Sequence, residues 1–167
     1  MKTYRSPREL LAEMKRALAR KPSFRNSPLS EIIELLCRGR HYSWMGIYLV
    51  VGGATRQQLL EEGMDASHPG QLRMPETRTK ILVQMKLADR EIGVLDVESP
   101  AENAFGGEDR VLLEDVAMLL ARFLTGPGKY VARKAREKAT SASAVPARRP
   151  QSASAGRGSK TAAVGEK

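Results

Sequence analysis

Two strand-like runs, residues 77–87 and 91–98, are separated by only three residues. In the first run, apolar side chains occupy every second position from Ile81 to Leu87, which is the period of a strand with one face on a core. Because parallel strands need a long crossover between them, so short a connection predicts an antiparallel pair. The chain must therefore build its core on an antiparallel sheet.

A further strand is expected over residues 41–51. Trp44, Gly46 and Tyr48 would share one of its faces. Both faces of this run are apolar, which is typical of a central strand covered on both sides. A glycine pair turns the chain after it, and residues 56–63 are expected to return as a hairpin strand or, alternatively, to form a short helix.

Three helices are expected around these strands. Ser6 and Ser27 are each followed by proline, and a capping residue before a proline at the first helical position is a strong helix start. The third helix is expected over residues 108–124, which present a wide apolar face. Its first turn carries Glu108 and Asp109, where carboxylates interact favourably with the positive end of the helix dipole.

The order of these elements predicts an α+β fold, with an antiparallel sheet on which helices from the N-terminal and C-terminal parts pack. We expect an N-terminal helix and connector over residues 1–27, the sheet domain over residues 28–126, and a basic tail over residues 127–167. The tail is expected to hold a helical turn or two over residues 129–138. Its Ala, Ser, Gly and Pro-rich remainder, residues 139–167, is expected to be disordered.

The net charge of +9 is unevenly distributed. Residues 1–40 carry +6, residues 41–126 carry −5 and residues 127–167 carry +8. The acidic middle is unlike a nucleic-acid groove. The basic tail could hold nucleic acid through salt-sensitive contacts, but it has no aromatic residue besides Tyr130 to stack on bases. A solubilising extension is therefore the preferred interpretation.

The single cysteine, Cys37, limits the chemistry that the chain can perform. It excludes a disulfide within the chain and a zinc site with several thiolates, and it fits a reducing compartment. We interpret Cys37 as a small packed residue; the alternative is a reactive thiol whose pKa is lowered by Arg38 and Arg40. His41 and His68 are isolated in the sequence, so no metal or cofactor is expected.

No secretory leader and no apolar run of bilayer length is recognisable in the sequence. We therefore expect a cytoplasmic protein with no membrane association.

Three motifs, taken in order, resemble a GAF domain. WMGIYL (residues 44–49) lies in the first expected strand, EIGVLDVESP (residues 91–100) lies in the last, and Ala104-Phe105 with Glu108-Asp109-Arg110 opens the long helix. The resemblance covers about residues 28–125. It leans towards the branch that contains free methionine-(R)-sulfoxide reductase.

In that branch, the resemblance places Trp44, Tyr48, Asp96 and Glu98 on positions that line the substrate pocket. The alternation of side chains along a strand supports this, because Trp44 and Tyr48 lie on the same face of the first expected strand. Asp96 and Glu98 likewise lie on the same face of the last expected strand. Aromatic rings and carboxylates could surround a small polar or cationic ligand. Lys80 stands where the family carries a substrate-contacting Glu, so it inverts one charge or neutralises Asp96 or Glu98. For the residues taken singly, the preferred interpretations are core packing for the aromatics and simple hydration for the acids, with ligand contact as the alternative.

The reductase uses cysteines in a segment that corresponds to residues 52–79, and none is present there. Sulfoxide reduction needs a second, resolving thiol. The resemblance therefore implies a non-catalytic, GAF-like sensory or regulatory module for signalling that binds a small molecule. A homodimer through the flanking helices is expected, with the exposed part of the apolar stripe over residues 10–18 as the candidate surface. The alternatives are a divergent free methionine sulfoxide reductase-like enzyme and a nucleic-acid accessory protein that acts through its basic tail.

Overall fold

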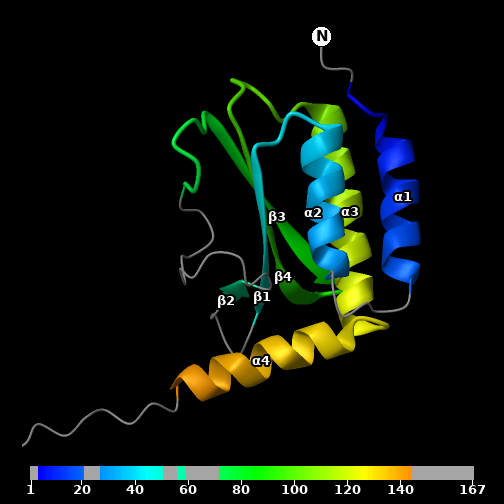
Figure 1. Ribbon diagram of the computed structural model, residues 1–167, viewed down its shortest axis with the longest axis vertical. Helices are drawn as coiled ribbons and strands as arrows, with labels where there is room; N and C mark the ends of the chain where they lie inside the picture. Colours follow the sequence, from blue (N-terminus) through cyan, green and yellow to red (C-terminus); the bar gives the residue numbers. More distant parts are fainter. Residues whose placement is uncertain (1–3, 21–26, 51–55, 59–71, 144–167) are drawn as a thin grey trace, which may run out of the picture.

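The computed structural model describes residues 4–20, 27–50, 56–58 and 72–143 (Figure 1). Within those ranges the chain confirms the α+β class. In chain order, its elements are α1 (Pro7–Ala19), α2 (Pro28–Gly39), β1 (Trp44–Val50), β2 (Arg56–Gln58), β3 (Thr79–Leu87), β4 (Arg90–Ser99), α3 (Gly107–Thr125) and α4 (Lys129–Ser143).

The first two helices begin at the predicted serines. The Oγ of Ser6 accepts a hydrogen bond from the backbone N–H of Glu9 at 3.4 Å, and the Oγ of Ser27 accepts one from Leu29 at 3.3 Å. A proline stands in the first turn of each helix, where its missing N–H removes no helical hydrogen bond. Short-range chemistry therefore sets both starts.

The strands form one antiparallel sheet in the order β2-β1-β4-β3. The predicted hairpin is confirmed, because β3 and β4 pair along their length and are joined by a tight turn. β1 is paired on both sides, as expected for a central strand. Of the segment expected as strand or short helix, residues 56–58 form β2, and residues 59–63 lie outside the described residues.

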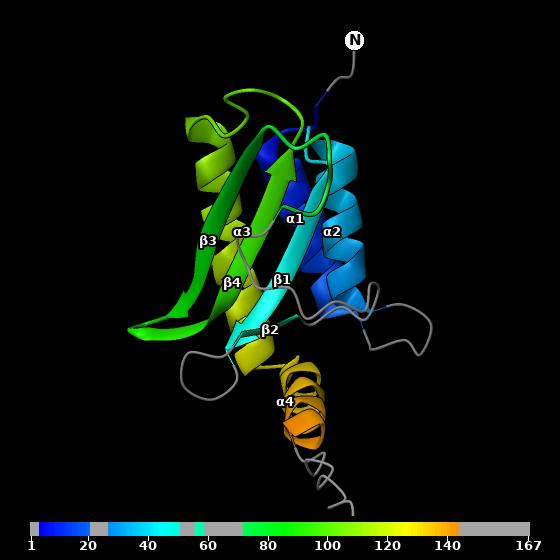
Figure 2. The same cartoon turned by 90° about the vertical axis from the view of Figure 1, so that its left-hand side faces the viewer.

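The helices α2 and α3 pack on one face of the sheet, α1 lies on the far side of these two helices, and no described helix covers the opposite face (Figures 1 and 2). Both faces of β1 are nevertheless buried, with Met45, Ile47 and Leu49 in the core shared with the helices and Gly46 and Tyr48 on the other face. The expectation of a strand covered on both sides is therefore confirmed. Residues of all three helices and of β1, β3 and β4 share one core, whose fully buried members include Leu29, Ile32, Leu36, Ile47, Leu49, Met85, Leu95, Leu112 and Leu113.

The apolar stripe over residues 10–18 is mostly buried inside this chain. Leu10, Met14, Ala17 and Leu18 are at most 8% exposed and belong to the common core. α1 packs this stripe against α2 and α3. Leu11, which belongs to the same stripe, is only partly buried, and a homodimer through this part of α1 stays a prediction.

α4 is longer than the helical turn or two expected over residues 129–138. A Cβ on Gly128 would lie 2.3 Å from the ring of Phe123, so glycine allows the chain to pass close to α3 before α4 begins. Ala132 and Ala135 are 3% and 8% exposed and join the core. Packing of this small-residue face stabilises a helix that its isolated sequence would form only weakly.

Residues 139–143, which were expected to be disordered, belong to α4. The rest of the expected disordered tail, residues 144–167, lies outside the described residues. Among the helices that the structure describes, none combines the length and the apolar character needed to cross a lipid bilayer.

Candidate functional site

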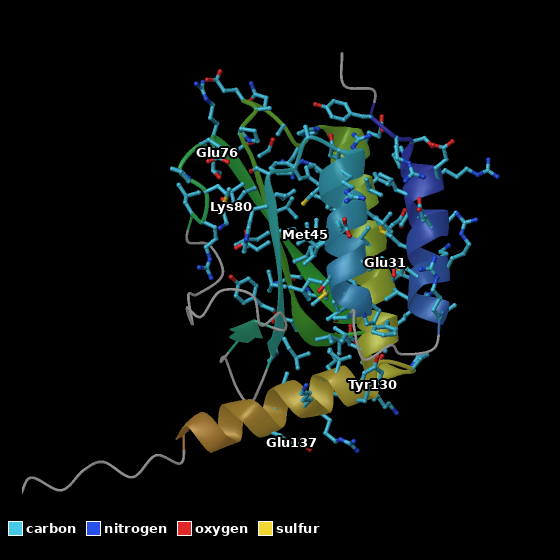
Figure 3. The ribbon with its side chains drawn as sticks, viewed as in Figure 1. Glu31, Met45, Glu76, Lys80, Tyr130 and Glu137 are labelled. Atoms are coloured by element: carbon cyan, nitrogen blue, oxygen red, sulfur yellow. The ribbon has the colours of Figure 1, made fainter. Side chains whose placement is uncertain are left out.

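The five residues predicted to contact a ligand lie together on the sheet face that α1, α2 and α3 leave uncovered. Strand pairing places Trp44 of β1 and Lys80 of β3 on either side of Glu98 of β4. Asp96 is two residues before Glu98 and Tyr48 is four residues after Trp44, so both point to the same side. We call these five residues the polar sheet face. Figure 3 shows Lys80 on this side, away from the helices.

The aromatic part of the polar sheet face depends on Gly46, which separates the two aromatic residues along β1. A Cβ at Gly46 would lie 2.4 Å from the Trp44 ring and 3.0 Å from the Tyr48 ring. The glycine therefore lets both rings lie close over the strand. Tyr48 is 1% exposed, and its buried hydroxyl has no hydrogen-bond partner among the described residues.

The charged part is a lysine held between two carboxylates. The Nζ of Lys80 lies 3.0 Å from an oxygen of Asp96 and 3.1 Å from an oxygen of Glu98. Both acids have no exposed surface. A buried carboxylate is stable only when it is paired and hydrogen-bonded, so the expectation that these acids are hydrated at a strand end is wrong. The expectation that Lys80 neutralises them is confirmed.

Glu98 also fastens the segment before β3 to the sheet. Its carboxylate accepts hydrogen bonds from the backbone N–H groups of Arg73 at 2.7 Å and Met74 at 3.0 Å, and from the Thr77 hydroxyl at 2.5 Å. Burial alone would raise the pKa of Glu98. The bonds from Thr77, the two amides and Lys80 outweigh it and hold the pKa below its ordinary 4.5. The carboxylate oxygens of Glu98 are therefore already hydrogen-bonded to groups of the protein itself.

The protein's own cations also occupy the aromatic side of the polar sheet face. The Lys80 ammonium lies 5.8 Å from the centroid of the Trp44 ring, and the Arg73 guanidinium carbon lies 5.6 Å from it. Cations at such distances are attracted to the ring face. Ring and carboxylates thus form a cage for an ammonium group, and Lys80 fills it. The hydroxyl of Tyr48 is the group of this face that contacts no described polar partner.

Sequence reasoning missed Arg73 and Met74, which lie in a segment that reads as loop, and Thr77, which was expected only as the first residue of a strand. Nothing in their local pattern indicates that their amides and hydroxyl close on a glutamate more than 20 residues away, as the separations of 25, 24 and 21 residues show. The only related signal in the sequence is the apolar alternation that begins after Thr77, which predicts that a strand starts there but not that the preceding residues contact Glu98.

Cys37 lies in α2, within the helical layer and not on the polar sheet face. Burial raises the pKa of its thiol to about 11. The expectation that Arg38 and Arg40 would lower this pKa is wrong, because removal of the thiol from water has the larger effect. At neutral pH the side chain is a protonated thiol that packs against the core, as its preferred interpretation holds.

A second buried charge cluster joins the end of α2 to the start of α3. Arg40 donates to Asp109 at 2.7 and 3.1 Å and to Glu108 at 2.9 Å, and the hydroxyl of Tyr42 donates to Asp109 at 2.7 Å. Glu108 and Asp109 do lie in the first turn of α3, as expected. Asp109 has the further role of anchoring α2 and β1, which the sequence did not reveal because Arg40 is 69 residues away.

In the described ranges, no group of three or more His, Cys, Asp and Glu side chains is placed to hold a metal ion. His41 instead donates from Nε2 to the carbonyl oxygen of Ala104 at 2.7 Å. Neither the comparison with protein-family models nor the comparison with curated proteins found a match.

Proposed function

We propose that the chain is a non-catalytic, GAF-like sensory module that binds a neutral or zwitterionic small molecule over the polar sheet face. The observation that carries this proposal is the meeting of all five predicted contact residues on one face, from β1, β3 and β4. Alternation along each strand predicts only which residues share a strand face. Their convergence requires the pairing register, and it supplies an aromatic wall beside charged groups, as in many small-molecule sites.

Lys80 decides the class of ligand. Its ammonium already lies between Asp96 and Glu98 at 3.0 and 3.1 Å, so an amine from outside would have to displace a tethered one. With Arg73 over Trp44, two cations face two carboxylates and the site is balanced in charge. A ligand with no net charge can approach such a site without leaving a buried charge unpaired.

Tyr48 offers a contact that the described protein groups do not use. Its buried hydroxyl has no hydrogen-bond partner among the described residues, and a hydroxyl left in that state costs about 1–3 kcal/mol. A ligand carbonyl, amide or carboxylate oxygen that accepts from this hydroxyl would remove that cost. The phenol is thus the group through which the site would orient its ligand.

A thermal-shift screen of neutral and zwitterionic metabolites, including amino acids, tests the proposal with the full chain. A compound at 100 times its Kd should stabilise the fold by about 2.7 kcal/mol. Tyr48→Phe should raise the melting temperature of the free protein, because it removes the unpaired buried hydroxyl, and it should weaken ligand binding by about 1 kcal/mol.

Tyr42→Phe is the matched control. Its hydroxyl donates to Asp109 at 2.7 Å, so its loss should lower the free protein's melting temperature and leave ligand affinity unchanged. The proposal fails if no compound raises the melting temperature of the wild type, or if Tyr48→Phe binds the compound with wild-type affinity.

A further inference from the structure

An open hollow of about 440 Å³ lies where the start of β4, the end of α3 and the first half of α4 meet. Figure 3 locates it by Tyr130 on α4, at the other end of the molecule from Lys80. The side chains that line the hollow are those of Arg90, Leu124, Thr125, Lys129, Tyr130, Ala132, Arg133 and Arg136.

Positive charge dominates this hollow. Lys129, Arg133 and Arg136 recur at i, i+4 and i+7, which places them on one face of α4, and Arg90 approaches from the sheet. No carboxylate is among the lining residues. Glu137 pairs with Arg133 at 3.7 Å, but both side chains are more than two-thirds exposed, and such surface pairs contribute little.

The lining also combines three properties that suit a phosphate-bearing ligand. Arginine presents a planar fork of donors that matches phosphate oxygens in pairs. Leu124 and Ala132, which are 2% and 3% exposed, make a rigid floor. Tyr130 is 38% exposed, so its ring is accessible for stacking with a base.

We propose that this hollow binds phosphate groups, supplied by a nucleic-acid strand or by a free polyphosphate. Four cations that repel one another around a single hollow are favoured by an anion between them. The sequence that follows α4, residues 144–167, is also basic, with five Lys/Arg and one Glu. The sequence suggested anion binding through the basic tail alone, whereas the hollow combines cations of α4 with Arg90 of β4.

The test compares the full chain with two triple variants. Arg90→Ala/Arg133→Ala/Arg136→Ala removes three cations of the hollow, and Arg8→Ala/Lys15→Ala/Arg16→Ala removes three cations from the exposed side of α1. All six side chains are exposed, so both variants should melt at the wild-type temperature, as circular dichroism would check.

Binding is measured by fluorescence anisotropy of a labelled single-stranded oligonucleotide over a salt series, and by calorimetry with inorganic triphosphate. Each lost phosphate contact lowers the log–log salt slope for single strands by about 0.7. The hollow variant should therefore lose about 2 units of slope for the oligonucleotide and lose affinity for whichever probe binds. The α1 variant should behave as the wild type.

Binding of triphosphate alone would identify a free polyphosphate as the source, and binding of the oligonucleotide alone would identify a strand. Equal affinity and equal salt slope for the two variants would overturn the proposal, as would a wild type that binds neither probe. The hollow and the polar sheet face lie towards opposite ends of β4, at Arg90 and Glu98. Success or failure of phosphate binding at the hollow therefore does not decide whether the polar sheet face binds a small molecule, which the thermal-shift screen tests separately.

Discussion

At the scale of single residues, Lys80 compensates the two buried acids of the polar sheet face. Its side chain is 13% exposed and contacts two carboxylates that are almost fully buried. Without an ammonium at this point, Asp96 and Glu98 would leave negative charge uncompensated in a region that excludes water, which is strongly destabilising. Lys80 therefore acts as a counter-ion that the chain carries with it.

Replacement of Lys80 by alanine should destabilise the fold by about 3–5 kcal/mol, because it leaves buried carboxylates without their partner. The atoms removed correspond to n-propylamine, so millimolar n-propylamine should raise the melting temperature of Lys80→Ala and leave that of the wild type unchanged. n-Propanol, which has the same shape without the charge, should not do so. Lys86→Ala, on the exposed side of the same strand, is the control. Equal stabilisation by the amine and the alcohol would show that the ammonium is not required.

Glu98 predicts a pH dependence with a defined sign. Its pKa in the folded protein lies below its ordinary 4.5, so its stabilising effect is complete above that value and is lost as the pH falls through the folded pKa. Glu98→Gln should therefore melt at a lower temperature than the wild type at pH 7, and the difference should shrink as the pH falls below 4.5. Thermal melts across this range check it, with Glu114→Gln on the exposed side of α3 as control. A difference that does not change with pH would contradict the assignment.

At the scale of elements, the fit between β1 and β4 depends on two glycines with different roles. Gly46 makes room for aromatic side chains on the polar sheet face. Gly93 instead permits backbone contact, since a Cβ there would lie 2.0 Å from the carbonyl oxygen of Tyr48 and 2.5 Å from the Cε of Met85. The element that approaches Gly93 closely is thus the neighbouring strand β1.

Gly93→Ala should therefore destabilise the protein by about 3 kcal/mol, since backbone atoms yield less readily than the end of a side chain. Gly107→Ala is a suitable control because a Cβ there meets nothing within 4 Å, and alanine favours the helix it would enter. Denaturant unfolding measures both free energies. If the two variants proved equally stable, the close approach of β1 to β4 would not be a constraint.

At the scale of the whole molecule, the folded body is larger than the segment that resembles a GAF domain. α1, expected as an N-terminal attachment, buries Leu10 and Met14 completely, and α4 adds Ala132 and Ala135 to the same core. The body also separates its charges. Balanced acids and bases meet on the polar sheet face, while cations gather around the hollow beside α4. The two candidate sites thus lie towards opposite ends of the same sheet.

The sequence by itself determined the features that depend on neighbouring residues. Ser6 and Ser27 start helices because a hydroxyl and a following proline act within one turn. The β3–β4 hairpin follows from its short turn, and the grouping of Trp44 with Tyr48 follows from the alternation of side chains along a strand. These rules act over a few residues, so they can be read without knowledge of the fold.

Only the tertiary structure decided which of these groups meet. The register that sets Lys80 and Trp44 beside Glu98, the closure of Thr77 on the same acid, and the pairing of Arg40 with Asp109 all join segments distant in the chain. Each of these contacts is set by how strands pair and helices pack, and many sequences with the same periodicity would pair differently. The fold also buries Asp96 and Glu98 beside Lys80, because charged groups removed from water are stable only when they are paired with opposite charges.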